Sequence, residues 1–187
     1  MGSNVVNLSL KGTTQHVVTD AISSLFPGHD CFVSPNSQNW VSVFDAAFES
    51  FAIEAIIETA RALSRGCSAS ALLAAVYDSD VLMLWVIDPL GNVVAEYNSC
   101  PDYFESEIND QEVPVDRIAE AVSALSNPPV MPKLIADALQ SDDVFLEEAL
   151  TTLGGLLGVR FLAWNYDTLA DCGAESCPDF ERFIRVT

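Results

Sequence analysis

Few residues in this sequence have the types and spacing that chemistry requires. Cys100 and Asp102 stand two positions apart and could give a small hydrolase or transferase a thiol and a carboxylate. Such a site would need a concave pocket that perturbs the pKa values of both groups. The sequence has no phosphate-binding glycine loop, no nucleophile elbow and no His-Glu-x-x-His motif. An enzyme near these two residues is therefore the alternative interpretation, and we assign no catalytic residue.

The histidines and cysteines offer only weak ligand or nucleophile patterns. His16 lies in a predicted helix and His29 in a turn, two residues before Cys31. A thiol and an imidazole could act together there, but a buried, inert thiol is the commoner state of such a cysteine. Cys172 and Cys177 could supply two zinc ligands, and a zinc site would need two more. We expect no metal and no cofactor.

Polar-tipped aromatic residues and acids form the second set of candidates. Trp40 opens a predicted strand, Trp85 lies within another, and Tyr97 and Tyr103 flank the exit of a third. Such side chains either fill the core, which is the commoner case, or line a ligand groove. The candidate binding residues are Trp40, Asp45, Trp85, Tyr97, Asn98, Asp102, Tyr103, Glu105, Glu107, Glu112, Asp116 and Glu120.

The charge of the chain separates the possible partners. With 27 Asp and Glu against 8 Lys and Arg, the formal net charge is −19, and 50% of the residues are hydrophobic. That apolar content excludes intrinsic disorder. A strongly negative surface repels phosphate groups and anionic lipids, so we expect neither nucleic acid nor a membrane as partner. A basic protein is the expected partner, and the oligomeric state stays open.

The acids are densest between Asp102 and Glu120, where seven carboxylates accompany a single base, Arg117. A helix here would place Asp116 and Glu120 one turn apart on the same face. This run predicts a surface for a basic partner, whose association would be faster at low salt. The competing interpretation is that the acids only keep the protein in solution. The function favoured is thus a non-catalytic acidic binding module.

Location follows from what the apolar segments and cysteines allow. The longest apolar runs, Ala71–Tyr77 and Val81–Ile87, fall well short of the roughly 18 residues that span a bilayer. No apolar stretch of signal-peptide length precedes Gly12. Five scattered cysteines are an odd number, and we expect all five to be reduced in a cytoplasmic protein.

The elements that position these residues alternate in type. A strand at Val5–Leu10 precedes a helix that begins after two threonines and ends near Phe26. Short strands are expected at Cys31–Ser34 and Trp40–Asp45, around a segment rich in turn-forming residues. These two strands carry several of the candidates.

The clearest helix is Phe51–Arg65. Its apolar stripe includes Ile56 and Ile57, charged residues hold the opposite face, and Gly66 is expected to close it. This stripe predicts that the helix packs against a sheet and that Ile56 and Ile57 are buried in the contact.

Three strands should follow as an antiparallel meander, at Ala71–Tyr77, Val81–Ile87 and Asn92–Asn98. Short turns between them force antiparallel pairing. The middle strand is apolar on both faces and should be covered on both sides, whereas Glu96 places its neighbour nearer an edge.

The second half is predicted to be helical. Helices are expected at Val115–Leu125, Pro132–Gln140 and Val144–Leu157, followed by a strand-like segment at Val159–Tyr166 and an ambiguous tail. The whole chain, 1–187, is predicted to be one α+β domain with an antiparallel or mixed sheet and helices packed on it. Its parts are a sheet-rich 1–104, a helical 105–158, and a strand with an irregular tail at 159–187.

One short sequence occurs twice. Ser99–Glu105 is echoed by Ser176–Glu181, and each copy follows an apolar run that contains a tryptophan. Either a decayed duplication or chance similarity of two turns explains this, and the second is favoured because no fixed period runs through the chain.

Two segments carry a resemblance. Trp-Val-Ser-Val-Phe-Asp at Trp40–Asp45 and Tyr-Asn-Ser-Cys-Pro-Asp-Tyr-Phe at Tyr97–Phe104 resemble a group of uncharacterised bacterial proteins over about Asn39–Phe104. That group implies no established activity. As an acidic α+β domain, the chain is also similar in charge and class to the SUKH-type superfamily. Bacterial members of that superfamily act as immunity proteins against secreted toxins, so the resemblance implies toxin neutralisation.

Overall fold

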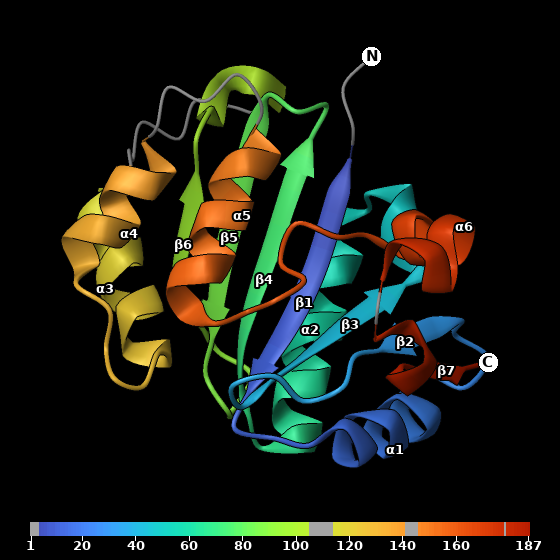
Figure 1. Cartoon of the computed structure of the whole chain (residues 1–187). Coiled ribbons are helices and arrows are strands. Elements are labelled where there is room, and N and C mark those ends of the chain that lie inside the picture. The colour runs from blue at the N-terminus through green and yellow to red at the C-terminus, as the bar shows by residue number, and fades with distance from the viewer. Residues whose placement is uncertain (1–3, 105–113, 141–145, 178) are drawn as a thin grey trace.

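Seven strands form one antiparallel sheet in the computed structural model of the chain, with the order β6-β5-β4-β1-β3-β2-β7 (Figure 1). The structure describes residues 4–104, 114–140, 146–177 and 179–187, without the side chains of residues 104 and 172–176. The strands are β1 Val5–Lys11, β2 Cys31–Val33, β3 Trp40–Asp45, β4 Ser70–Tyr77, β5 Val81–Ile87, β6 Val93–Asn98 and β7 Ile184–Val186.

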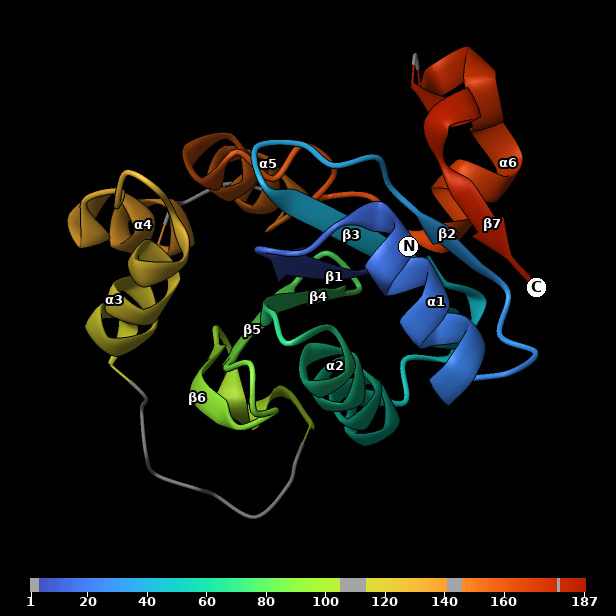
Figure 2. The same ribbon diagram turned by 90° about the horizontal axis from the view of Figure 1, so that it is seen from below.

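Helices cover both faces of this sheet (Figure 2). One face carries α1 and α2, and the other carries α3, α4 and α5, with α6 beside β2. The α+β class and the helical second half are therefore as predicted. The helices are α1 Gln15–Leu25, α2 Ile53–Cys67, α3 Val115–Leu125, α4 Pro132–Leu139, α5 Leu146–Leu157 and α6 Tyr166–Ser176, with short 3-10 turns η1 Ala46–Ser50, η2 Pro101–Phe104 and η3 Phe180–Arg182.

The predicted meander is present as β4, β5 and β6. All seven residues of β5 are buried, because α2 covers one face of the strand and α3 covers the other. Ile56 on α2 packs into the core beside Leu73 of β4. As expected, β6 lies at the edge of the sheet, and Val93, Val94 and Glu96 are exposed there.

Capping hydrogen bonds account for the start of α1 and the end of α2. Thr14 caps α1 by accepting a hydrogen bond from the amide of Val17, as the threonines predicted. The expectation that Gly66 closes α2 is wrong, because the helix continues to Cys67. Ser68 takes the left-handed conformation instead, with φ 49°, and its amide bonds the carbonyls of the last turn.

The predicted strand at Val159–Tyr166 is wrong. The segment is a series of turns on the sheet face, where Phe161 and Leu162 are buried. The carbonyl of Phe161 accepts a hydrogen bond from the Asn7 side chain, 2.9 Å away, so this backbone group needs no strand partner. The chain then forms α6, which Asn165 caps through the Thr168 amide.

The tail after Tyr166, for which the sequence pattern predicted no clear element, forms a helix and a short strand. After α6, the strand β7 pairs with β2 at the edge of the sheet, with Cys31 opposite Val186. The two echoed segments therefore differ in their surroundings: η2 follows a strand, whereas η3 follows a helix.

Candidate functional site

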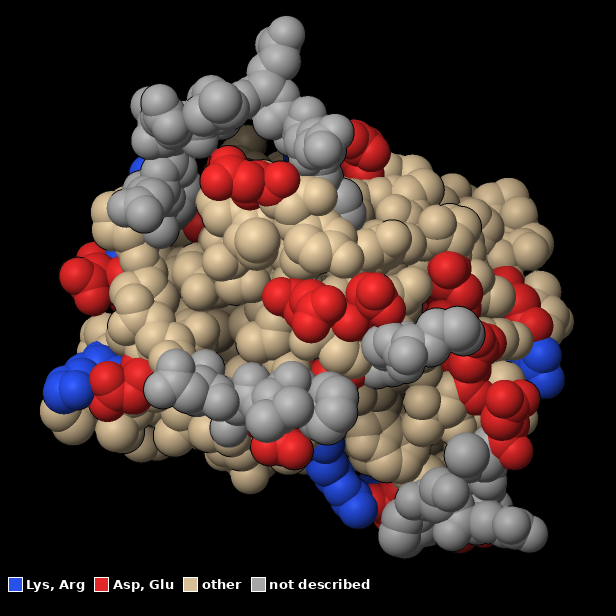
Figure 3. All heavy atoms as spheres, turned by 90° about the horizontal axis from the view of Figure 1, so that it is seen from above, with Lys and Arg blue, Asp and Glu red and all other residues tan. Residues whose placement is uncertain are grey.

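Carboxylates gather where β4 and β6 end and β5 begins, and we name this surface the acidic edge. It comprises Asp78 and Asp80 in the β4–β5 turn, Asp102 in η2, and Glu147 and Glu148 at the start of α5. Figure 3 views this end of the molecule from above. Red carboxylates are spread across the described surface, and blue basic side chains lie only toward its margins.

Three elements are tied together at the acidic edge. The Ser79 hydroxyl donates to Glu147 Oε1 at 2.8 Å, which joins the β4–β5 turn to α5. Tyr103 in η2 packs edge-on against Tyr77 with ring centroids 5.8 Å apart. Partial burial, together with the charges of Asp78 and Asp80, raises the pKa of the Tyr103 phenol. The edge is thus an electronegative surface with an exposed aromatic ring.

Most basic side chains are engaged elsewhere in the molecule. Lys11 lies at the far end of β1, opposite Ser70, whereas the β4–β5 turn lies near Asn4. Lys11 therefore does not lie at the acidic edge. Five of the eight bases form ion pairs with acids outside this edge, namely Arg61, Lys133, Arg160, Arg182 and Arg185.

The predicted aromatic candidates fall mainly in the core. Trp40 is 1% exposed and its indole N–H donates to the Leu157 carbonyl at 3.1 Å. Trp85 is also buried, on the face that α2 covers. Tyr97 is half-buried beneath α4, and Asn98 accepts a hydrogen bond from the Cys100 amide. These side chains support the sheet, and only Tyr103 is exposed to a partner.

Five further acidic candidates belong to α3 or to the segment that precedes it in the sequence. Asp116 and Glu120 are exposed on that helix, one turn apart as predicted. Nothing in the described contacts joins them to the acidic edge. Glu105, Glu107 and Glu112 lie outside the described residues.

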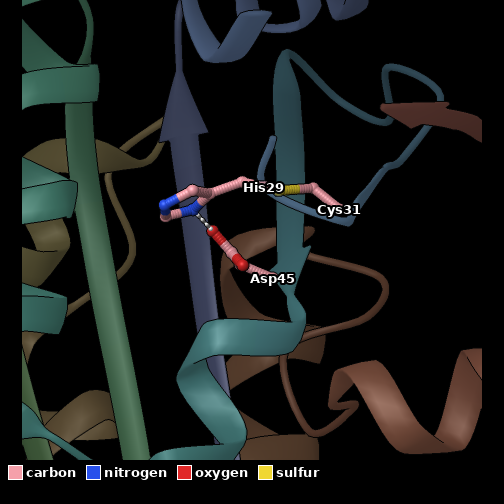
Figure 4. A group of neighbouring side chains, drawn as sticks. All are labelled: His29, Cys31 and Asp45. Atoms are coloured by element: carbon pink, nitrogen blue, oxygen red, sulfur yellow. Dashed lines mark hydrogen bonds and ion pairs between the residues drawn. The ribbon is translucent and has the colours of Figure 1, made fainter. Parts of the chain in front are cut away.

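The strands β2 and β3 bring together a cluster that the sequence analysis did not join. His29, Cys31 and Asp45 place one nitrogen, one sulfur and one oxygen within 4.8 Å of one another (Figure 4). Cys31 and Asp45 are opposite each other across the β2–β3 pair. The imidazole edge that bears Nδ1 is turned toward Asp45, and Nδ1 lies 2.6 Å from Oδ2.

Asp45 is 3% exposed and is the centre of this cluster. Its Oδ1 accepts a hydrogen bond from the Ala47 amide at 2.9 Å, which caps η1. Its other oxygen, Oδ2, makes the contact with His29 Nδ1, so both oxygens of the carboxylate are engaged. Burial, then the charge of Asp45 and a hydrogen bond to it, raises the pKa of the Cys31 thiol well above its usual range.

This arrangement is not that of a cysteine nucleophile. A catalytic thiol needs the imidazole as its base, whereas Cys31 bonds the carboxylate and is fully buried. The Cys100 and Asp102 pair lacks a histidine partner as well, since His16 is exposed on α1 and His29 bonds Asp45. The described geometry therefore gives no support to a thiol hydrolase.

A pocket of about 350 Å³ lies between α5 and the turns that follow it. Gln38 from the β2–β3 loop, Thr151, Gly155, Arg160 and Trp164 are among the residues that line it. A side chain at Gly155 would meet no atom within 4 Å, so the glycine leaves space there. Arg160 pairs with an acid of the tail, and that pairing occupies the one cationic group among the lining residues. The pocket therefore carries no free charge to select a ligand.

One signal for the cluster was present in the sequence. The two strands were predicted at nearly the observed bounds, and folding them about the intervening turn pairs Cys31 with Asp45. His29 stands just before the first of these strands. The 350 Å³ pocket had no such signal, because the segment that forms one wall resembles a strand.

Comparisons of the chain with family models, curated proteins and solved structures find no match. Along the described ranges, each helix is too short or too polar to cross a membrane.

Proposed function

We propose that the protein is a non-catalytic binding module whose acidic edge engages a basic protein partner. The observation that carries this proposal is that Asp80, Asp102 and Glu148 are exposed at the acidic edge, while five of the eight bases pair with acids outside it. Complementary charge speeds association and fixes orientation more than it adds affinity. The partner should therefore present clustered Lys and Arg.

Proteins that bind nucleic acid are the class of partner that presents clustered Lys and Arg, because these residues line the groove that holds the phosphate backbone. Covering such a groove would neutralise a toxin that acts on nucleic acid, which is the immunity-type form of the proposal. Exposed Tyr103 would supply an aromatic contact within the charged surface. Cys31, Cys67, Cys100 and Cys177 are free thiols, and this favours the cytoplasm as the location.

The test compares two variants that change the net charge equally. The edge variant carries Asp80→Asn, Asp102→Asn and Glu148→Gln, and the control variant carries Asp20→Asn, Glu96→Gln and Glu181→Gln, all at exposed positions. Tagged wild type and both variants are used to isolate bound proteins from the source cells at low salt. Bound proteins are quantified by mass spectrometry.

We expect a basic protein on the wild type and the control variant, at least about tenfold depleted on the edge variant and released as salt rises. With the purified partner, the association rate of the edge variant should be the slower one. Equal recovery on both variants would refute the acidic edge as the binding surface. Recovery of only acidic or neutral proteins would refute the charge argument itself.

A further inference from the structure

We propose that His29, Cys31 and Asp45 form a binding site for Zn²⁺, at a position separate from the acidic edge. The three side chains come from β2, β3 and the loop that precedes β2, so the fold and not one local motif brings them together. This inference departs from the expectation of no metal. It does not depend on the proposed partner binding.

The ligand chemistry selects the metal class. A thiolate, an imidazole and a carboxylate are the three side-chain ligands that zinc uses in proteins, whereas Ca²⁺ and Mg²⁺ take oxygen ligands. Thiolate and imidazole also favour zinc over hard cations of the same charge. A set with one thiolate, one imidazole and one carboxylate is therefore more specific for zinc than a group of carboxylates is.

The distances fit a metal-free form of such a site. With bonds of about 2.0 to 2.3 Å, ligand atoms around tetrahedral zinc lie roughly 3.3 to 3.7 Å apart. Here His29 Nδ1 and Asp45 Oδ2 are 2.6 Å apart, and the full set lies within 4.8 Å. Zinc would replace the hydrogen bond between these two groups, and side-chain shifts of about 1 Å would equalise the separations.

The charge around the cluster favours a cation. The buried Asp45 carboxylate has no Lys or Arg partner within the described chain, and the nearby Asp30 adds a second negative charge. Arg185 and Tyr166 already hold the Asp30 carboxylate, so Asp30 is not a fourth ligand. On zinc binding, the Cys31 thiol would lose its proton to solvent and become the thiolate ligand.

The histidine is the ligand nearest to solvent. Its side chain is 33% exposed, whereas that of Asp45 is 4% exposed, so an ion would reach the set by displacement of the imidazole side chain. Three protein ligands then leave a fourth position for water. Gly28, with φ 87°, forms the turn that brings the histidine back over the strand pair.

The test uses the full chain, reduced and treated with a chelator, and Zn²⁺ as the probe. Calorimetric titration is carried out with excess Mg²⁺, because Mg²⁺ occupies exposed carboxylates without competing for a thiolate. Co²⁺ provides a spectroscopic readout, since a Co²⁺–thiolate bond absorbs in the near ultraviolet. We expect one Zn²⁺ per chain and this absorption band on addition of Co²⁺.

Three variants and one control locate the ion. His29→Gln, Cys31→Ser and Asp45→Asn should each weaken Zn²⁺ binding by at least about 10- to 100-fold, since even outer-shell losses have that effect. Cys67→Ser removes another buried thiol of the core and should leave affinity unchanged. His29→Gln changes a partly exposed side chain, so it keeps the test valid if the two buried variants unfold.

Two results would overturn the inference. One is the lack of Zn²⁺ binding by the folded wild type in excess Mg²⁺. The other is binding that His29→Gln and Cys31→Ser leave unchanged, because the ion would then occupy surface acids. Loss of the Co²⁺ band in Cys31→Ser but not in Cys67→Ser supports the site independently of affinity.

Discussion

The two ends of the sheet satisfy their buried groups in different ways. At the β4–β5–β6 end, which we call the apolar end, neighbouring strands follow one another in the chain. The middle strand, β5, is entirely apolar and buried. At the β3–β2–β7 end, which we call the polar end, β7 is the edge strand and pairs with β2. Three polar residues are buried there, Ser34, Ser42 and Asp45. Apolar contacts fill most of the first end, whereas the second buries more polar groups, and each of them needs a partner.

A chain of hydrogen bonds joins β1 and β3 to the turns after α5. The Asn7 side chain donates to the Phe161 carbonyl, and the Ser9 hydroxyl bonds both Asn7 and Ser42, at 2.7 and 2.8 Å. These polar residues face the helices α5 and α6, between two apolar clusters. Because each group has its partner, burial of this row costs little, and it fixes where the turns after α5 must lie.

The largest effect should come from the buried carboxylate of the polar end. Asp45→Ala would leave the Ala47 amide and the Cys31 thiol without their acceptor and His29 without its partner. We expect a loss of about 3 to 5 kcal/mol in the free energy of unfolding, as for other broken buried pairs. Urea unfolding measures it. Asp45→Asn, which retains an oxygen for the cap, should lose less, and an equal loss would contradict this account.

The apolar end predicts a second, smaller effect that depends on burial alone. Ile56 is 2% exposed, and Ile56→Ala should cost about 3 kcal/mol. Ile57 is half-buried and packs against the same core cluster, so less apolar surface is lost when it is truncated. Ile57→Ala should cost about 1 to 2 kcal/mol. Thermal unfolding of the two variants tests this order, and equal losses would show that α2 packs differently.

Acid should weaken the polar end selectively. Hydrogen bonds from Arg185 and Tyr166 outweigh partial burial and lower the pKa of Asp30 to about 2. A lowered pKa stabilises the fold above the unfolded-state value, about 4, and this contribution is lost as pH falls toward 2. Arg185→Met should therefore flatten stability between pH 4 and pH 2. An unchanged acid profile would show that the pair contributes nothing.

The smallest effect is expected at the acidic edge. Changing Asp80, Asp102 and Glu148 together to their amides should alter the free energy of unfolding by no more than about 0.5 kcal/mol per position. Any change should favour the folded state, since removing like charges lessens self-repulsion. Guanidinium would mask this charge effect, so urea is the suitable denaturant. A large loss would mean that these acids hold the structure together.

Sequence reasoning succeeded where structure is local. The strand bounds at Trp40–Asp45 and Val81–Ile87 and the helix at Val115–Leu125 are those observed, because periodicity and turns determine them. It failed at Val159–Tyr166, whose apolar pattern equals that of a strand. The Phe161 carbonyl accepts from the Trp164 amide within the turns and from the distant Asn7 side chain, and no local pattern indicates the second of these bonds. Short β7 has too few residues to give a pattern.

The candidate sites follow the same division. The acidic character of Asp102 could be read from composition, but its proximity to the β4–β5 turn required the fold. For the metal cluster, Asp45 was a candidate and His29 and Cys31 were weighed as a pair, yet no local rule links the carboxylate to them. Their association needs the strand register, the loop before β2 and the capping role of Asp45 together.

The late position of β7 has a consequence for synthesis of the protein on the ribosome. Asp30 beside β2 and its partner Arg185 on β7 are 155 residues apart. At about 5 to 20 residues per second, translation would separate them by roughly 8 to 30 s. During this interval the edge of β2, with Phe32, is without the neighbour that later covers it, and such edges recruit other strands. A chaperone that binds nascent chains would have its longest opportunity at this edge.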